Sequence, residues 1–229
     1  MQSQEEALEQ IFEKLKTKAC VKQNAFRAVQ EVFKKLKSEA ETITTQLKDK
    51  IVKVDKSIDV KLIKKNEYEF QLKAGSDMLI FTLATNVVTF NDEYEVMKSD
   101  YIKEKAERKY FGQIMVYNFL ADTIKYNRLD DPGYLIARLI VNCEKHFFVE
   151  GTQQLSFLFT DIVNNVISDD WLKLLIEKCI FTAIDMDLMG SSYPEIRNTN
   201  LKQKMKNEKP MGNGKKVGFQ MDYMNEIKG

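Results

Sequence analysis

The sequence contains one histidine, one tryptophan, three cysteines and three prolines among its 229 residues. The cysteines, at positions 20, 143 and 179, are odd in number and far apart, a pattern that fits neither a disulfide framework nor a cysteine-rich metal site. We therefore predict a reducing, cytoplasmic setting. A zinc site draws on several histidines, cysteines or carboxylates at close spacing, so we also predict no metal and no cofactor.

Long apolar runs and a net excess of one charge are missing as well. The densest apolar segment, residues 171–184, is interrupted by Lys173, Glu177 and Lys178, whereas a membrane-spanning helix needs about 20 apolar residues. The acidic amino-terminal stretch has no feature of a secretory signal. Basic and acidic residues nearly cancel, 35 against 34, so no global field attracts nucleic acid or an anionic membrane. We expect a soluble protein that does not bind membranes.

Sequence motifs of common enzyme classes do not occur in the chain. There is no nucleophile elbow, H-E-x-x-H, dinucleotide G-x-G-x-x-G or C-x-x-C motif, and residues 212–216 lack the spacing of a phosphate loop. Because active sites also assemble from distant residues, this absence leaves enzymatic activity open while favouring a non-catalytic protein. If the chain is an enzyme, Asp122 and Asp131 are the candidate carboxylates.

Residues 1–50 contain neither glycine nor proline and repeat apolar side chains every 3.5 residues on average. Alternating steps of four and three from Leu8 reach eleven apolar positions out of twelve. The series is Leu8, Phe12, Leu15, Ala19, Lys22, Phe26, Val29, Phe33, Leu36, Ala40, Ile43 and Leu47. Such a pattern over more than five heptads predicts a long amphipathic, coiled-coil-like helix as a first domain, residues 1–50.

A helix of this length, roughly 60 Å, cannot bury its whole apolar side against its own small domain. We therefore predict a homo-oligomer, most simply a dimer, with Lys22 helping to set the register of the seam. Two alternatives stay open: packing of the helix on the chain's own sheet, which the bulky phenylalanines favour, and pairing with another protein's helix. The predicted interface consists of Phe12, Leu15, Phe26, Val29, Phe33 and Leu36.

After Lys50 the apolar period changes to two, which predicts an α+β domain over residues 51–190 with a central antiparallel β-sheet meander. Strands are predicted around 58–62, 68–72 and 77–90, with turns at 65–66 and 74–76. Residues 92–109 are interpreted as a strand and a charged turn, and 110–127 as a strand. A hairpin of residues 134–142 and 146–151 and a further strand at 151–162 follow. Ser168 is predicted to cap a core helix that extends to residue 189.

The single histidine, His146, lies between polar neighbours at the predicted hairpin. Without a second histidine, we interpret it as a hydrogen-bonded strand residue rather than a catalytic or metal-binding one. A weaker hypothesis is a ligand pocket between sheet and helix, lined by Tyr117, Tyr126, Arg128 and His146, in which the arginine would bind an anionic or planar group.

From residue 191 large aliphatic residues become rare, and residues 197–216 carry seven basic side chains and one acidic. We predict a flexible basic tail over residues 191–229. The sequence thus favours a non-catalytic oligomeric interaction module that binds a protein partner through its sheet surface or tail. The alternatives are a regulatory domain that senses a small ligand, and nucleic-acid binding through the basic tail.

Overall fold

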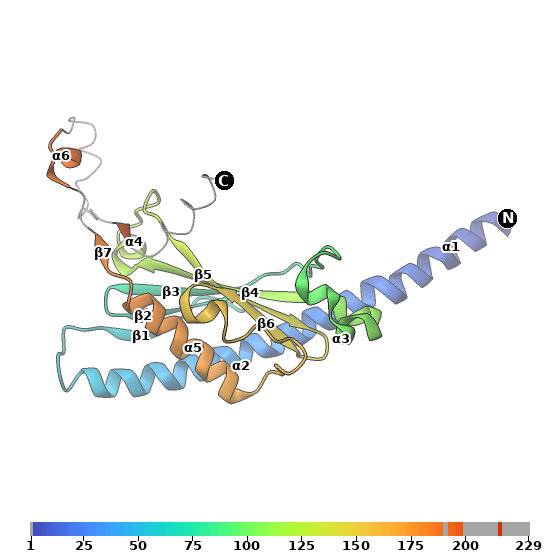
Figure 1. The fold of residues 1–229 in the computed structure, drawn as a ribbon, viewed down its shortest axis with the longest axis horizontal. Helices are drawn as coiled ribbons and strands as arrows, with labels where there is room; N and C mark the ends of the chain where they lie inside the picture. The colour runs from blue at the N-terminus through green and yellow to red at the C-terminus, as the bar shows by residue number, and fades with distance from the viewer. Residues whose placement is uncertain (1, 190–191, 199–214, 217–229) are drawn as a thin grey trace.

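The structure is a computed structural model, and it describes residues 2–189, 192–198 and 215–216. Its longest element is a continuous helical rod at the amino terminus, drawn in blue in Figure 1. The rod consists of α1 (Gln2–Lys14), the π-helical segment η1 (Leu15–Ala19) and α2 (Cys20–Ile51). Since no glycine or proline interrupts these residues, nothing in the backbone ends the helix before residue 51. The predicted long helix is confirmed.

The predicted antiparallel meander is also confirmed, as a six-stranded sheet whose spatial order follows the chain. Its turns lie where the sequence predicts them, and Gly75 adopts the left-handed backbone conformation, with a φ of 62°, that a tight turn requires. The strands are β1 (Val60–Lys64), β2 (Glu69–Ala74), β3 (Asp77–Leu83), β4 (Phe111–Leu120), β5 (Tyr134–Asn142) and β6 (Phe147–Gly151).

One face of the sheet is covered by α2 and α5 (Asp169–Ile184). The Ser168 hydroxyl accepts a hydrogen bond from the Trp171 backbone amide, so this residue is the predicted N-cap. Val29 and Leu36 of α2 and Leu175 of α5 belong to the same buried cluster as the strand residues. The helix and the sheet therefore share a single hydrophobic core, and the domain boundary predicted at residue 50 separates two elements of that core.

The opposite face is partly covered by residues 92–109, for which the prediction of a strand and a charged turn is wrong. They form the short helices η2 (Glu95–Lys98), α3 (Asp100–Glu104) and η3 (Ala106–Lys109). Met97 and Ile102 pack with Phe111, Ile140 and Phe148 in a second buried cluster. Burial of a few apolar side chains decides the conformation here, and a short segment with no clear period gives no local sign of it.

The predicted strand over residues 110–127 is too long. Pairing stops at Leu120, opposite Asp77, because β3 begins there and offers no partner for the residues beyond. Residues 121–125 form the short helix α4 (Ala121–Lys125) instead. Asp122 and Lys125 therefore lie on a helical turn.

The strand predicted at residues 151–162 is wrong as well. Residues 153–156 form η4 (Gln153–Ser156), and the chain then runs along the free side of β6. The Phe159 carbonyl accepts a hydrogen bond from the Val149 amide at 3.0 Å, and the Asn165 carbonyl accepts one from the Phe147 amide at 2.9 Å. This irregular segment satisfies the edge of the sheet without forming a ladder.

Beyond α5 the described residues form β7 (Leu188–Met189), β8 (Lys215–Lys216), which pairs with β7, and α6 (Tyr193–Ile196). Most of the predicted basic tail lies outside the described residues. Within the described part of the chain, no helix combines the length and the apolar character that crossing a membrane requires.

Candidate functional site

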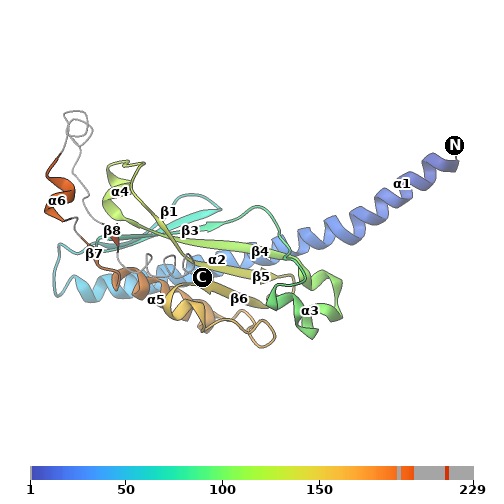
Figure 2. The ribbon, with the colours of Figure 1, turned by 45° about the horizontal axis from the view of Figure 1, so that its top comes forward.

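The amino-terminal part of the rod projects beyond the sheet and α3 as a free helical arm (Figures 1 and 2). We define the arm as residues 2–20. Every residue from 6 to 20 is exposed, and Ala25 is the first buried residue along the rod. At about 1.5 Å per residue the arm extends roughly 28 Å from the body. It is therefore a helix without tertiary contacts along most of its length.

Four large apolar side chains lie on the arm at helical spacing. We call Leu8, Ile11, Phe12 and Leu15 the stripe. Their exposed fractions are 66%, 55%, 57% and 55%. Single exposed apolar residues are common on protein surfaces, but the spacing of three and four residues aligns these side chains along one side of a helix. The stripe is thus an apolar surface with no partner within the described chain.

The structure divides the predicted oligomer interface into two parts. Val29, Phe33 and Leu36 are at most 1% exposed and lie in the chain's own core, where a second copy could not reach them without opening the fold. Phe26 is partly buried against the same core. These four residues pack on the chain's own sheet, which is one of the two alternatives predicted above, because α2 is the helix that covers the sheet. Phe12 and Leu15 remain exposed.

The π-helical segment η1 explains why the single apolar repeat of the sequence forms two separate surfaces, the exposed stripe and the buried side of α2. A π-type turn contains about one residue more than an α-turn, so an apolar repeat that crosses η1 no longer follows one side of the rod. Lys22, the predicted register residue, lies just past η1 with its Nζ 5.5 Å from the centre of the Tyr110 ring. In the single chain it therefore lies beside the body, and its role in setting a register stays a prediction.

The arm also separates its charges along its length. Residues 2–13 carry four glutamates and no lysine or arginine, whereas residues 14–22 carry four lysines and no acidic residue. An ion pair within the arm joins Lys16 to Glu13 at 3.3 Å, with both side chains about half exposed or more. Exposed pairs of this kind contribute little to stability, so the charges stay available to another molecule.

The polar hairpin end that contains His146 forms a network of hydrogen bonds and ring contacts. The His146 ring stacks on Tyr101 with 4.3 Å between ring centres, and its Nδ1 lies 2.9 Å from the Ile162 carbonyl oxygen. His146 also forms an isolated β-bridge with Val166. This agrees with the interpretation of His146 as a hydrogen-bonded strand residue. Burial raises the pKa of the neighbouring Cys143 thiol, which disfavours the reactive thiolate.

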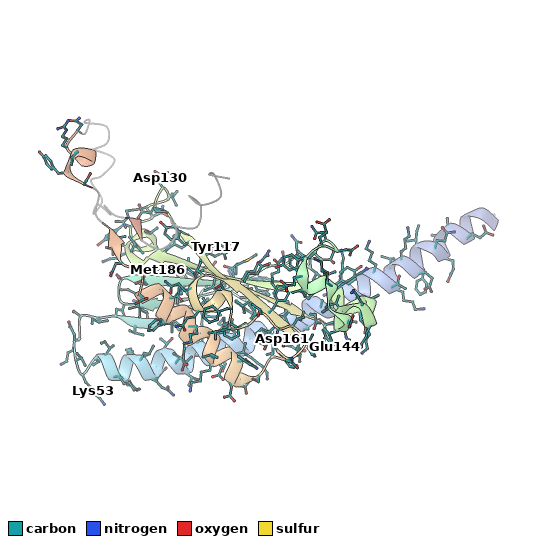
Figure 3. The ribbon with its side chains drawn as sticks, in the orientation of Figure 1. Lys53, Tyr117, Asp130, Glu144, Asp161 and Met186 are labelled. Atoms are coloured by element: carbon teal, nitrogen blue, oxygen red, sulfur yellow. The ribbon has the colours of Figure 1, made fainter. Side chains whose placement is uncertain are left out.

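The centre of that network is Glu144, which sequence reasoning missed as a hub. Its carboxylate accepts hydrogen bonds from Lys105 at 2.7 Å, Arg108 Nε at 2.9 Å and the Tyr101 hydroxyl at 3.1 Å. Led by the bond from Lys105, these donors lower the pKa of Glu144 to about 2, while burial raises the pKa of Tyr101 to about 12. The charged groups therefore neutralise one another. Figure 3 places Glu144 at the end of the sheet from which the arm leaves.

The four residues of the hypothetical ligand pocket are not brought together. Tyr117 pairs with Leu135 near the start of β5, whereas His146 follows the end of β5 at Asn142, about 23 Å away along the strand. Tyr126 and Arg128 lie in the loop after α4, where Arg128 Nε donates to Asp131 at 2.6 Å. The strand meander thus separates His146 from the other three residues.

A second apolar surface lies between α2 and α5. It is a groove of about 370 Å³ whose apolar lining consists of Ile43, Leu47, Ile180, Phe181 and Ile184. Phe181 and Ile184 are more than half exposed.

Across the described residues, no group of three or more histidine, cysteine or acidic side chains could hold a metal ion. Comparison of the chain with family models, curated proteins and solved structures found no match.

Proposed function

We propose that the chain is a non-catalytic interaction module whose helical arm joins two copies into a homodimer. The observation that carries this proposal is the stripe: four large apolar side chains in helical register on a projecting arm whose residues 6–20 are all exposed. A second helix with a similar apolar side is the simplest surface that covers such a stripe. A closed two-fold dimer satisfies both copies at once.

Burial of the stripe is the contribution that would stabilise such a dimer. Full burial of a leucine, isoleucine or phenylalanine side chain stabilises by about 1.5–3 kcal/mol, and the stripe residues are a little over half exposed in the single chain. Because a two-fold dimer contains two stripes, it would remove eight such side chains from water at one interface.

The polar groups support a non-catalytic role. At the hairpin end Glu144 is held by three donors and its pKa is lowered to about 2, so it would not release or take up a proton near neutral pH. Arg128 and Asp131, at the other end of the sheet, are paired with each other. Binding of a protein partner through the sheet surface or tail stays a prediction, as do ligand sensing and nucleic-acid binding by the tail.

The test replaces stripe residues and measures the molar mass by light scattering over a range of concentrations. We expect the chain to be a dimer at high concentration, and Leu8→Asp/Phe12→Asp to be a monomer with an unchanged denaturation midpoint at low concentration. Leu8→Ala/Phe12→Ala removes the apolar surface while keeping strong helix formers, so it should also weaken the dimer.

Leu129→Asp is the matched control, because Leu129 is 85% exposed and lies outside the arm. It should leave the dimer intact. A wild-type chain that is monomeric at the highest concentration, or a dimer that survives both stripe variants, would reject the proposal.

A further inference from the structure

We infer that the stripe is covered by the arm of a second copy running in the antiparallel direction, with Glu9 of each copy beside Lys16 of the other. This inference rests on the proposed function and specifies its geometry. The two possible directions of a helix pair differ in which charges they bring together. The arm has an uneven charge distribution, so its sequence distinguishes between them.

The first argument is the separation of charge along the arm. A parallel pair aligns residues of equal number, which places the glutamate half, residues 2–13, beside a second glutamate half, and the lysine half, residues 14–22, beside a second lysine half. An antiparallel pair aligns each glutamate half with a lysine half. Opposite charges on neighbouring helices attract and like charges repel, so the antiparallel direction is favoured.

The second argument is the position of Glu9 and Lys16 relative to the stripe. Each directly follows a stripe leucine, Leu8 or Leu15, and the two are seven residues apart, so they lie on the same flank of the stripe. The two-fold axis of an antiparallel pair brings this flank of one arm against the same flank of the other. Glu9 then faces Lys16 of the second copy, and the pair occurs twice. In a parallel pair, the flank with Glu9 and Lys16 on one arm faces the other flank of the second arm, which carries Ile11 and Lys18.

The third argument is that the apolar residues can be matched in this direction. With Phe12 beside Leu15 of the second copy, Leu15 lies beside Phe12 by symmetry. Both positions belong to the heptad series, and both are exposed in the single chain. The pairing is self-complementary and therefore closes at two copies.

A charge exchange tests the predicted contact. Glu9→Lys or Lys16→Glu alone places two like pairs in the interface, and we expect either change to raise the dissociation constant by about tenfold. The double variant Glu9→Lys/Lys16→Glu restores both attractive pairs and should return the dissociation constant to within about twofold of the wild-type value. Glu6→Lys and Lys14→Glu, which alter the same two charge halves away from the stripe, are the matched controls and should each change it by less than about threefold.

The direction is tested with the exposed thiol of Cys20, in a Cys143→Ser background that removes the other partly accessible thiol. Antiparallel arms hold the two Cys20 residues about 20 Å apart along the pair, too far for a disulfide. We therefore expect mild oxidation of the dimer to produce no covalent dimer. Parallel arms place the two thiols at the same height, where oxidation would link them.

The possible outcomes separate this inference from the proposed function. The antiparallel arrangement is supported if the double variant restores the wild-type dissociation constant and oxidation of the dimer forms no Cys20 disulfide. A stripe-dependent dimer that is linked through Cys20 overturns the direction and leaves the proposed function standing. If the charge exchanges have no effect and Phe181→Asp dissociates the dimer, the arm lies in the groove between α2 and α5 of the second copy, which also overturns the inference. A monomeric chain overturns both.

Discussion

At the scale of single residues, Glu144 is the carboxylate on which three donors converge at the hairpin end of the sheet. It joins Lys105 and Arg108 of the η3 region and Tyr101 of α3 to the β5–β6 turn. The Arg108 side chain is only 10% exposed and also stacks on Tyr101, with its Cζ 4.0 Å from the ring centre. A buried guanidinium needs a nearby carboxylate, because removal of one partner leaves an uncompensated charge.

We predict that Glu144→Gln lowers the free energy of unfolding at pH 7 by about 1–3 kcal/mol, since a charged hydrogen-bond hub is lost beside buried Arg108. Urea denaturation followed by circular dichroism measures this. Glu104→Gln is the control: Glu104 also pairs with Arg108, at 2.9 Å, but is 68% exposed. Its replacement should cost less than about 1 kcal/mol. Equal losses in the two variants would contradict the hub role of Glu144.

The same carboxylate predicts a dependence of stability on pH. The pKa of Glu144 is lowered from its ordinary 4.5 to about 2 in the folded chain, so the folded state binds a proton less readily than the unfolded state. Its stabilisation is complete above about pH 4.5 and is lost as the pH falls towards 2. The difference between wild type and Glu144→Gln in urea denaturation should therefore shrink over that interval. A difference that stays constant from pH 7 to pH 2.5 would argue against this.

Individual residue roles were predictable from the sequence only where local information decides them. The lone histidine excluded a multi-histidine site, and Ser168 before two aspartates indicated a helix N-cap. The hub at Glu144 could not be predicted, because its donors lie 36 to 43 residues earlier in the chain. Their segment folds into short helices through its contacts with the sheet, and these contacts have no signature in the local sequence.

At the scale of elements, α2 and β4 approach each other closely at Val29 and Gly112. A Cβ atom added at Gly112 would lie 2.2 Å from Cγ1 of Val29 and 2.5 Å from its Cβ. Both residues are in the buried interior, where packing is dense and displacement is costly. The absence of a side chain at residue 112 therefore sets how closely the rod approaches the sheet.

We predict that Gly112→Ala lowers the free energy of unfolding by about 1–3 kcal/mol through overpacking. Val29→Ala alone should also destabilise, by leaving a cavity. If the two residues are in contact, the double variant should be more stable than the sum of the single losses implies, with a coupling of about 0.5–3 kcal/mol. Strict additivity in chemical denaturation would show that α2 does not approach β4 as described.

Elements with a sustained period were predictable, whereas elements fixed by their neighbours were not. The alternation in β1, β2 and β5 and the repeat in α2 each extend over enough residues to identify the element. The strand at 110–127 was predicted too long because its end is set by the start of β3, which is a property of the sheet. Leu155, Phe157 and Phe159 alternate as in a strand, yet residues 153–156 form η4 and the chain after it lies beside β6 as an irregular segment.

At the scale of the whole molecule, the described chain combines a body, with its main core and a second buried cluster, and an arm that has no residue in either cluster. We predict that deletion of residues 2–20 leaves the body folded, with an unfolding temperature that is independent of concentration. The full chain should melt at a temperature that rises with concentration, because dimerisation stabilises the folded state by mass action. Differential scanning calorimetry over a hundredfold range of concentration measures both.

An unfolded truncated chain would show that the arm supports the body. A full chain whose unfolding temperature does not change with concentration would count against assembly through the arm. In both cases the stripe would need another explanation.

The stripe was only partly predictable from the sequence, because its extent depends on the body that lies beneath the rod. The repeat through residues 8–47 correctly indicated that the rod exceeds what the body can cover, and Phe12 and Leu15 are exposed as this requires. The repeat could not show where coverage stops, because that depends on the width of the sheet beneath α2. It also could not show the π-type turns of η1, at which the rod changes from a free helix to a buried one.

Because α2 continues into the arm without a loop, the arm has no hinge of its own, and its direction is fixed by the packing of α2 on the sheet. The rod has the geometry of a lever. A tilt of about 10° at Cys20 would move the far end of the arm, roughly 28 Å away, by about 5 Å. Small movements between α2 and the strands are therefore amplified along the arm, and any force applied to the arm acts directly on the layer that closes the core.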